Sequence, residues 1–226
     1  MSLLYNWTPN NKLFRDGPPY REDIPDFKKP IADSMLDCGS IKNLVHFINM
    51  FLKEYNIKGK MLQVGASFNS MKQTEECFGL EAWNLDLVDD KQPTTIIGDV
   101  TNCPEIPNES FDFVFSSDTF EHLTTPWTAA KEMIRILKPN GLVFVTTLFS
   151  WRYHCCPIDY WRFTPQALMF LFKELECIEA NWDIHNRRVP QQGRSEGEPD
   201  YDICPEDHFG PWMENWRVYY VGRKTT

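Results

Sequence analysis

A helix, a turn and a buried strand follow one another in the stretch KEMIRILKPNGLVFVTT, residues 131–147. Thr125 and Pro126 mark a helix start upstream, and apolar residues at helical spacing predict one buried face up to Leu137. The run at 138–141 predicts a turn, and the apolar run at 142–146 a strand. A helix that turns back into a buried strand is the repeating unit of an α/β sheet.

The same alternation extends to both sides of this stretch. Short apolar runs predict further strands, and amphipathic runs predict further helices. The predicted strands lie at 60–65, 82–87, 94–97, 111–116, 142–146, 176–180 and 216–222, and two other helices at 40–55 and 164–171. This order predicts an α/β fold, a Rossmann-like doubly wound sheet with helices on both faces.

The length of 226 residues suits one domain. We expect residues 1–35, which are polar and rich in proline, to form an N-terminal extension or lid. Residues 36–226 would form the domain, with a loop insertion near 185–212 that is rich in glycine, proline and charge.

Composition limits the partners and the compartment. With 23 basic and 32 acidic residues, the net charge of -9 disfavours nucleic acid and anionic membranes as partners. The N-terminus does not resemble a signal peptide, and no apolar run is long enough to span a membrane. Seven scattered cysteines then indicate reduced thiols and a cytoplasmic protein. A homodimer is compatible with all of this.

Three predicted strands end in residues suited to a nucleoside-containing cofactor. In an open parallel sheet, ligands bind beyond the carboxyl ends of the strands. Gly65 permits a tight turn, Asp86 can accept the hydroxyls of a ribose, and Asp99 can accept the amine of an adenine beside Val100. Each residue also has an ordinary interpretation, as a strand-end glycine, a solvated loop acid or a turn aspartate. Their order along one alternating pattern favours a shared site.

The stretch from Met61 to about Phe172 resembles the class I S-adenosylmethionine-dependent methyltransferases, and in particular the methyltransferase-11-like group. The matching motifs are LQVGAS, NLDL, GDV, FDFVFSSDTFEHL and KEMIRILKPNGLVFVTT, the last being the most specific. The resemblance implies a mostly parallel seven-stranded sheet with an antiparallel last strand, for which 216–222 is the candidate. S-adenosylmethionine is the implied cofactor. The implied cofactor-binding residues are Gln63, Gly65, Ala66, Ser67, Asp86, Leu87, Asp99, Val100, Ser116 and Asp118. Gln63 stands where the family usually has an acid.

Residues that would act on the methyl acceptor should follow the fourth and fifth strands. The segment WRYHCCPIDYWRFTP, residues 151–165, resembles a signature of a subset associated with sugar and glycan modification. His154 and Asp159 are the candidate catalytic residues there, and His122 is the candidate after the fourth strand. Alternatively, Asp159 pairs with Arg162 and the aromatic residues pack in the core.

No metal site is predicted. His154 could join Cys155, Cys156 and Cys204 around zinc, but adjacent cysteines have poor chelate spacing and the chain has no Cys-x-x-Cys pair. The predicted function is O-methylation of a sugar, a glycan or another small hydroxylated acceptor. Two alternatives stay open: a methyltransferase acting on nitrogen or on protein, and a catalytically inactive cofactor-binding module that acts through partners.

Overall fold

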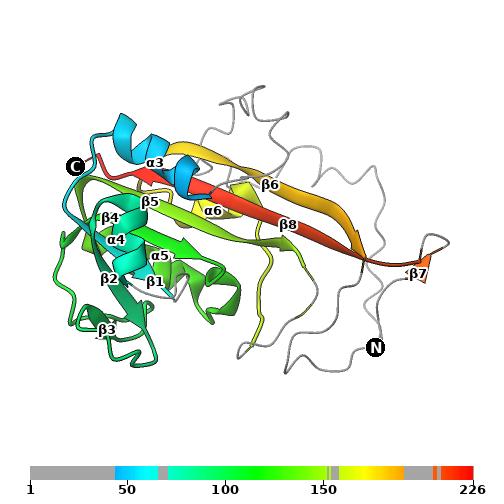
Figure 1. The fold of residues 1–226 in the computed structure, drawn as a ribbon, viewed down its shortest axis with the longest axis horizontal. Coiled ribbons are helices and arrows are strands. Elements are labelled where there is room, and N and C mark those ends of the chain that lie inside the picture. The colour runs from blue at the N-terminus through cyan, green and yellow to red at the C-terminus, as the bar shows by residue number, and fades with distance from the viewer. Residues whose placement is uncertain are drawn as a thin grey trace, which may run out of the picture. The chain divides into compact units, whose positions relative to one another are not determined.

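The computed structural model describes residues 44–65, 71–151, 153, 158–190, 206–207 and 210–225. Helices and strands alternate along these residues, as Figure 1 shows. The helices are α3 (Leu44–Glu54), α4 (Met71–Phe78), η2 (Phe120–His122), α5 (Pro126–Ile136) and α6 (Pro165–Leu171). The strands are β1 (Lys60–Val64), β2 (Glu81–Asp86), β3 (Thr95–Ile97), β4 (Phe111–Ser117), β5 (Leu137–Ser150), β6 (Glu176–Pro190), β7 (Glu206–Asp207) and β8 (Gly210–Arg223).

Seven strands form one sheet in the order β3-β2-β1-β4-β5-β8-β6, and the short β7 pairs with β8 outside this path. β1 to β5 are all parallel to one another. β8 is antiparallel to both of its neighbours, β5 and β6. The structure thus confirms the predicted doubly wound sheet and its antiparallel last strand.

Alternate side chains of the central strands face two separate cores. On β4, Val114 packs in the core that α5 and α6 cover, whereas Phe113 and Phe115 pack in the core that α3 and α4 cover. This alternation follows from the twofold side-chain period of a strand. The central strands β1, β4 and β5 are buried on both sides, which agrees with a sheet that is covered on both faces.

The stretch 131–147 departs from the prediction at its turn. β5 begins at Leu137, which pairs with Phe111, and the regular register resumes only where Leu142 pairs with Phe113. The extra residues form a bulge that includes Asn140, whose φ is +65°. Thr125 precedes α5 but makes no capping bond through its side chain, whereas the Thr164 hydroxyl accepts the Ala167 amide at 3.1 Å and caps α6.

Two further elements differ from the sequence pattern. The sequence pattern does not predict α4, because its sequence is mostly polar and buries only Met71, Thr74 and Phe78. β6 extends to Pro190 and β8 starts at Gly210, so strands occupy both ends of the predicted loop 185–212. These polar ends pair with each other as an antiparallel ribbon, which is visible in Figure 1. Backbone hydrogen bonds between the two strands hold the ribbon, so its residues do not need to alternate between apolar and polar. Residues 1–43 and 191–205 lie outside the described residues, and the predicted extension stays a prediction.

Candidate functional site

The turn after β1 is built around Gly65. Its φ is +76°, and its amide donates to the Leu85 carbonyl at 3.1 Å. A Cβ atom at this position would lie 2.6 Å from the Thr119 hydroxyl. That hydroxyl donates toward the carbonyls of Val64 and Ser117, at 3.2 and 3.1 Å. Thr119 therefore joins the ends of β1 and β4, and glycine leaves the backbone open there.

Gln63 supports this turn from within the chain. Its side chain is fully buried, and its amide nitrogen donates to the Gly65 carbonyl at 3.0 Å. Its amide oxygen accepts a long bond from the Thr74 hydroxyl of α4, at 3.5 Å. Both ends of the amide thus contact neighbouring chain, and a direct role in cofactor binding stays a prediction. Ala66 and Ser67 lie outside the described residues.

Asp86 and Asp99 follow β2 and β3, as predicted. Asp86 Oδ1 accepts the Val88 amide at 3.0 Å, and Asp99 Oδ1 accepts the amide and hydroxyl of Thr101, each at 2.8 Å. These bonds, within the described residues, use one oxygen of each carboxylate. Val100 is buried, whereas Leu87 is 70% exposed and offers an apolar surface next to Asp86.

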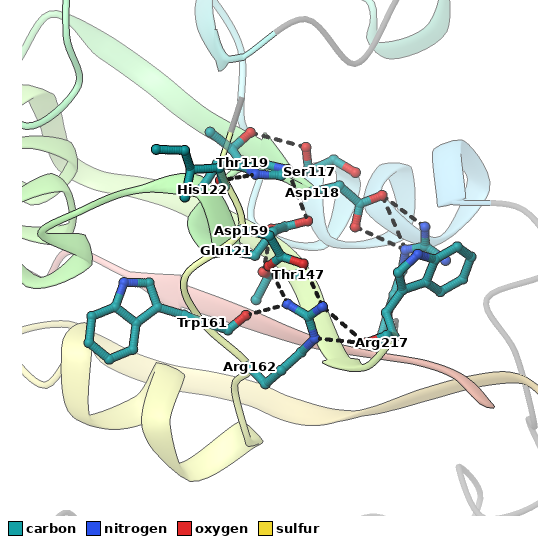
Figure 2. A network of polar contacts seen from close by, with 12 residues as sticks. Ser117, Asp118, Thr119, Glu121, His122, Thr147, Asp159, Trp161, Arg162 and Arg217 are labelled. Atoms are coloured by element: carbon teal, nitrogen blue, oxygen red, sulfur yellow. Dashed lines mark hydrogen bonds and ion pairs between the residues drawn. The ribbon is translucent and has the colours of Figure 1, made fainter. Parts of the chain in front are cut away.

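The loop after β4 is tied to β8 by an ion pair that spans 99 residues. Arg217 Nε and Nη2 donate to the Asp118 carboxylate at 2.9 to 3.1 Å, and Asp118 has a φ of +49° (Figure 2). The Arg217 guanidinium also stacks 5.5 Å from the Trp151 ring. The sequence offered no signal for Arg217, because only the sheet order brings β8 beside β5. The Ser116 hydroxyl is buried just before this loop and has no partner among the described residues.

Glu121 is the buried acid of this region. Its side chain has no exposed surface, and its Oε2 accepts the Thr147 hydroxyl of β5 at 2.7 Å. Its Oε1 has no hydrogen-bond partner among the described residues. Burial raises the pKa of the Glu121 carboxyl; the hydrogen bond from Thr147 and the His122 ring lower it, and the charge of Asp118 raises it. The sequence pattern does not single out Glu121, since a sequence does not show burial.

His122 lies beside Glu121 but is bonded to another segment. Its Nδ1 lies 2.7 Å from the Ile158 carbonyl, which can only accept, so Nδ1 carries the proton. Its Nε2 is 3.9 Å from Glu121 Oε1. The predicted residues His122 and Asp118 are therefore brought together with Glu121 at the end of β4.

Asp159 forms an ion pair with Arg162, as the alternative to a catalytic role for Asp159 predicted. Arg162 Nη2 donates to Asp159 Oδ2 at 2.6 Å, and Arg162 Nη1 donates to Oδ1 (Figure 2). Arg162 also donates to the Trp151 carbonyl, which closes the segment on itself. Because both carboxylate oxygens are engaged, Asp159 orders this segment. His154, with Cys155 and Cys156, lies outside the described residues, so its role as a base stays a prediction.

Exposed aromatic residues flank the same end of the sheet. The Glu121 carbonyl accepts the amides of Tyr160 and Trp161, at 2.8 and 3.2 Å. The Trp161 indole donates to the Leu123 carbonyl at 2.8 Å and meets Trp127 edge to face, with ring centroids 6.0 Å apart. Trp127 is 48% exposed, Tyr160 45% and Trp161 38%, so these rings form a surface instead of the predicted alternative, core packing.

Comparison with known proteins gives the domain its family. Residues 61–145 match the family model Methyltransf_11, a methyltransferase domain. No curated protein matches the chain. A putative methyltransferase from Bacillus halodurans C-125 is 14% identical, with a TM-score of 0.57 over 80% of this chain and 98% of that one.

Two other solved structures show the same fold. A putative methyltransferase from Haloferax volcanii, in complex with the Trm112 methyltransferase activator, is 18% identical, with a TM-score of 0.55 over 85% of this chain and 92% of that one. The 1,6-didemethyltoxoflavin-N1-methyltransferase of Burkholderia thailandensis, which holds S-adenosylhomocysteine, is 15% identical, with a TM-score of 0.54 over 80% and 78%.

Strand order and family match together define the class of protein. The chain has the class I methyltransferase fold, and the methyltransferase domain that residues 61–145 match implies S-adenosylmethionine as the cofactor. Its residues 61–145 form a methyltransferase domain of the Methyltransf_11 type. The residues present fit this cofactor: Gly65, where a side chain would collide with Thr119, the carboxylates of Asp86 and Asp99, and the apolar Val100 and Leu87 follow the ends of β1, β2 and β3.

Proposed function

We propose that the protein methylates a hydroxyl group of a sugar, a glycan or another small hydroxylated acceptor. The observation that carries this proposal is the aromatic surface of Trp127, Tyr160 and Trp161, whose exposed rings are held against the loop after β4. Flat aromatic faces suit ring-shaped ligands that combine an apolar face with polar edges. The net charge of -9 gives no support to a polyanionic acceptor.

The chemistry divides between cofactor and chain. S-adenosylmethionine supplies a methyl group on a positively charged sulfur, which is a ready leaving group. The chain has to hold the acceptor oxygen in line with that methyl group and to accept the proton that the oxygen loses. The loop after β4 and the end of β5 supply the polar groups for the second task, and the aromatic surface suits the first.

The test has two stages. Calorimetry with S-adenosylmethionine first measures cofactor binding, and a failure to bind at millimolar cofactor would contradict an active enzyme and favour the inactive module. Incubation with cofactor labelled in the methyl group then screens acceptors, beginning with sugars and glycans. Label transferred only to amines or to protein would favour the alternative methyltransferase and overturn the proposed acceptor class.

The aromatic surface has its own test. We expect Trp161→Ala to raise the KM for the acceptor about fivefold while cofactor affinity stays within twofold, because a ring stacked on a ligand contributes about 1 kcal/mol. Phe170→Ala is the matched control, since Phe170 is 55% exposed on α6, outside this surface. Equal changes of the acceptor KM in the two variants would show that the aromatic surface does not bind the acceptor.

The remaining expectations about partners stay proposals. We propose a cytoplasmic protein without a nucleic-acid or membrane partner, and with a homodimer as its assembly. Among the helices of the described residues, none combines the length and apolar character needed to cross a bilayer. Sedimentation velocity measures the mass of the assembly directly.

A further inference from the structure

Glu121 is a buried carboxyl with one oxygen that accepts no hydrogen bond from the described residues and lies 3.9 Å from His122 Nε2. Oε2 accepts the Thr147 hydroxyl at 2.7 Å, whereas Oε1 has no hydrogen-bond partner among the described residues. A buried acceptor without a donor is costly, so native structures usually satisfy it with a ligand, a water or a substrate group. Oε1 thus requires a donor from outside the described chain.

The position of this oxygen indicates which donor. Glu121 follows β4 and is bonded to Thr147 of β5, so it lies where the carboxyl ends of these neighbouring strands meet. This is the edge at which an open α/β sheet binds its ligands. The backbone carbonyl of Glu121 also holds Tyr160 and Trp161, which begin the aromatic surface.

The two neighbouring acids are less suited to receive a proton. Asp159 has both oxygens engaged by Arg162, and Asp118 is paired through both oxygens with Arg217. His122 holds its Nδ1 proton toward the Ile158 carbonyl, and its Nε2 lies 3.9 Å from Glu121 Oε1, so the ring stands beside the carboxyl as a second proton-carrying group. Glu121 alone among these acids keeps an oxygen without a donor in the described part of the chain.

We propose that Glu121 is a catalytic residue: its Oε1 accepts the hydrogen bond of the acceptor's nucleophilic hydroxyl and then its proton. In this step the acceptor oxygen forms a bond to the methyl carbon as the carbon–sulfur bond breaks, and the bonding pair stays on sulfur. The proton passes from the acceptor oxygen to Glu121 and later to solvent. The raised pKa of this carboxyl matches the task, because a base must hold a proton after taking it. The inference rests on the proposed methyl transfer.

A test without a known acceptor uses two cofactor analogues. S-adenosylhomocysteine lacks the transferable methyl group, and sinefungin carries an ammonium-bearing carbon in place of the methylated sulfur. An ammonium at the reacting centre would meet Glu121 Oε1, so we expect the wild type to bind sinefungin more tightly. Glu121→Gln should lose about tenfold or more of sinefungin affinity, while S-adenosylhomocysteine affinity stays within twofold. Calorimetry measures both.

Control variants separate this role from a structural one. Glu179→Gln is the matched control, because Glu179 on β6 also has a pKa raised by burial but is bonded to Tyr219 in the other core. It should leave both affinities unchanged. Thr147→Val keeps the carboxyl and removes a bond that lowers its pKa, so the pH at which the sinefungin preference appears should rise.

The charged neighbours are the same in every variant: Asp118 and His122 beside Glu121, Arg217 on β8, and the Asp159–Arg162 pair. Sinefungin affinity of Glu121→Gln equal to that of the wild type would overturn the proposal. A sinefungin affinity of Thr147→Val with the same pH dependence as that of the wild type would also overturn it. This second measurement is the test to use if Glu121→Gln does not fold. Absence of S-adenosylhomocysteine binding in the wild type would instead contradict the cofactor site and, with it, the proposed function.

Discussion

At the scale of single residues, Gly65 shows how a backbone position can exclude a side chain from the turn after β1. Its left-handed backbone and the nearby Thr119 hydroxyl exclude a side chain, and Thr119 cannot turn away without losing its bonds to two carbonyls. Gly79 also has a positive φ, +65°, but no heavy atom lies within 4 Å of a Cβ there. Substitution of Gly79 therefore measures backbone strain alone, whereas substitution of Gly65 measures backbone strain together with the collision with Thr119.

We expect Gly65→Ala to lower the free energy of unfolding by about 2 kcal/mol and Gly79→Ala by about 1 kcal/mol or less. Only Gly65→Ala should also weaken S-adenosylmethionine binding. Urea denaturation and calorimetry measure the two effects. Equal losses of stability and unchanged cofactor affinity would show that Thr119 does not restrict this turn.

Asp86 is the residue whose charge we expect to matter most for the cofactor. Asp86→Asn should reduce S-adenosylmethionine affinity by about tenfold or more without a change in stability, since hydrogen bonds to a carboxylate are stronger than those to an amide. Asp89→Asn is the control, because Asp89 is a neighbouring turn acid whose Oδ1 accepts the Lys91 amide at 2.7 Å. If both variants lose affinity equally, general charge rather than a specific contact is responsible.

At the scale of elements, the Asp118–Arg217 pair joins the loop after β4 to β8. The side chains are 36% and 25% exposed, so solvent weakens their attraction only in part. A double-mutant cycle of Asp118→Asn and Arg217→Met should give a coupling of about 1 kcal/mol in the free energy of unfolding. Asparagine is chosen because it tolerates the positive φ of Asp118.

The Lys72–Glu76 pair of α4 serves as the reference for this cycle. Its side chains are 83% and 68% exposed and its charged atoms are 3.9 Å apart, so its coupling should be about 0.3 kcal/mol. A coupling for Asp118 and Arg217 no larger than that of the reference pair would show that the ion pair does not hold the loop.

At the scale of the whole molecule, Glu121 affects how stability depends on pH. Its pKa is raised in the folded state by burial, so the folded chain keeps a proton at a pH where the unfolded chain has lost it. Stability from this group is therefore present below its unfolded pKa and declines as the pH rises through the folded pKa.

We expect Glu121→Gln, which cannot ionise, to be more stable relative to the wild type at pH 7 than at pH 4. Urea denaturation at the two pH values measures the difference. Glu179→Gln should behave in the same direction, since burial also raises the pKa of Glu179. A pH-independent difference between Glu121→Gln and the wild type would contradict a raised pKa at Glu121.

Much of the fold could be predicted because apolar runs and turn residues repeat along the chain. The seven main strands and the antiparallel last strand were confirmed, whereas α4 and the long ends of β6 and β8 were not anticipated. These elements are polar, and they exist because a neighbouring strand or core residue stabilises them. The local sequence of these elements does not show which distant strand or core residue will stabilise them.

Motifs and strand order are local properties, so the α/β class, the resemblance that implies the cofactor, and the places of Gly65, Asp86 and Asp99 at strand ends can be read from the sequence alone. Tertiary contacts set which polar groups meet beyond β4 and β5. It paired Asp159 with Arg162 and Asp118 with Arg217, and it left one oxygen of Glu121 without a donor in the described chain. Pairing and burial depend on residues far apart in sequence, so they arise only when the sheet brings those residues together.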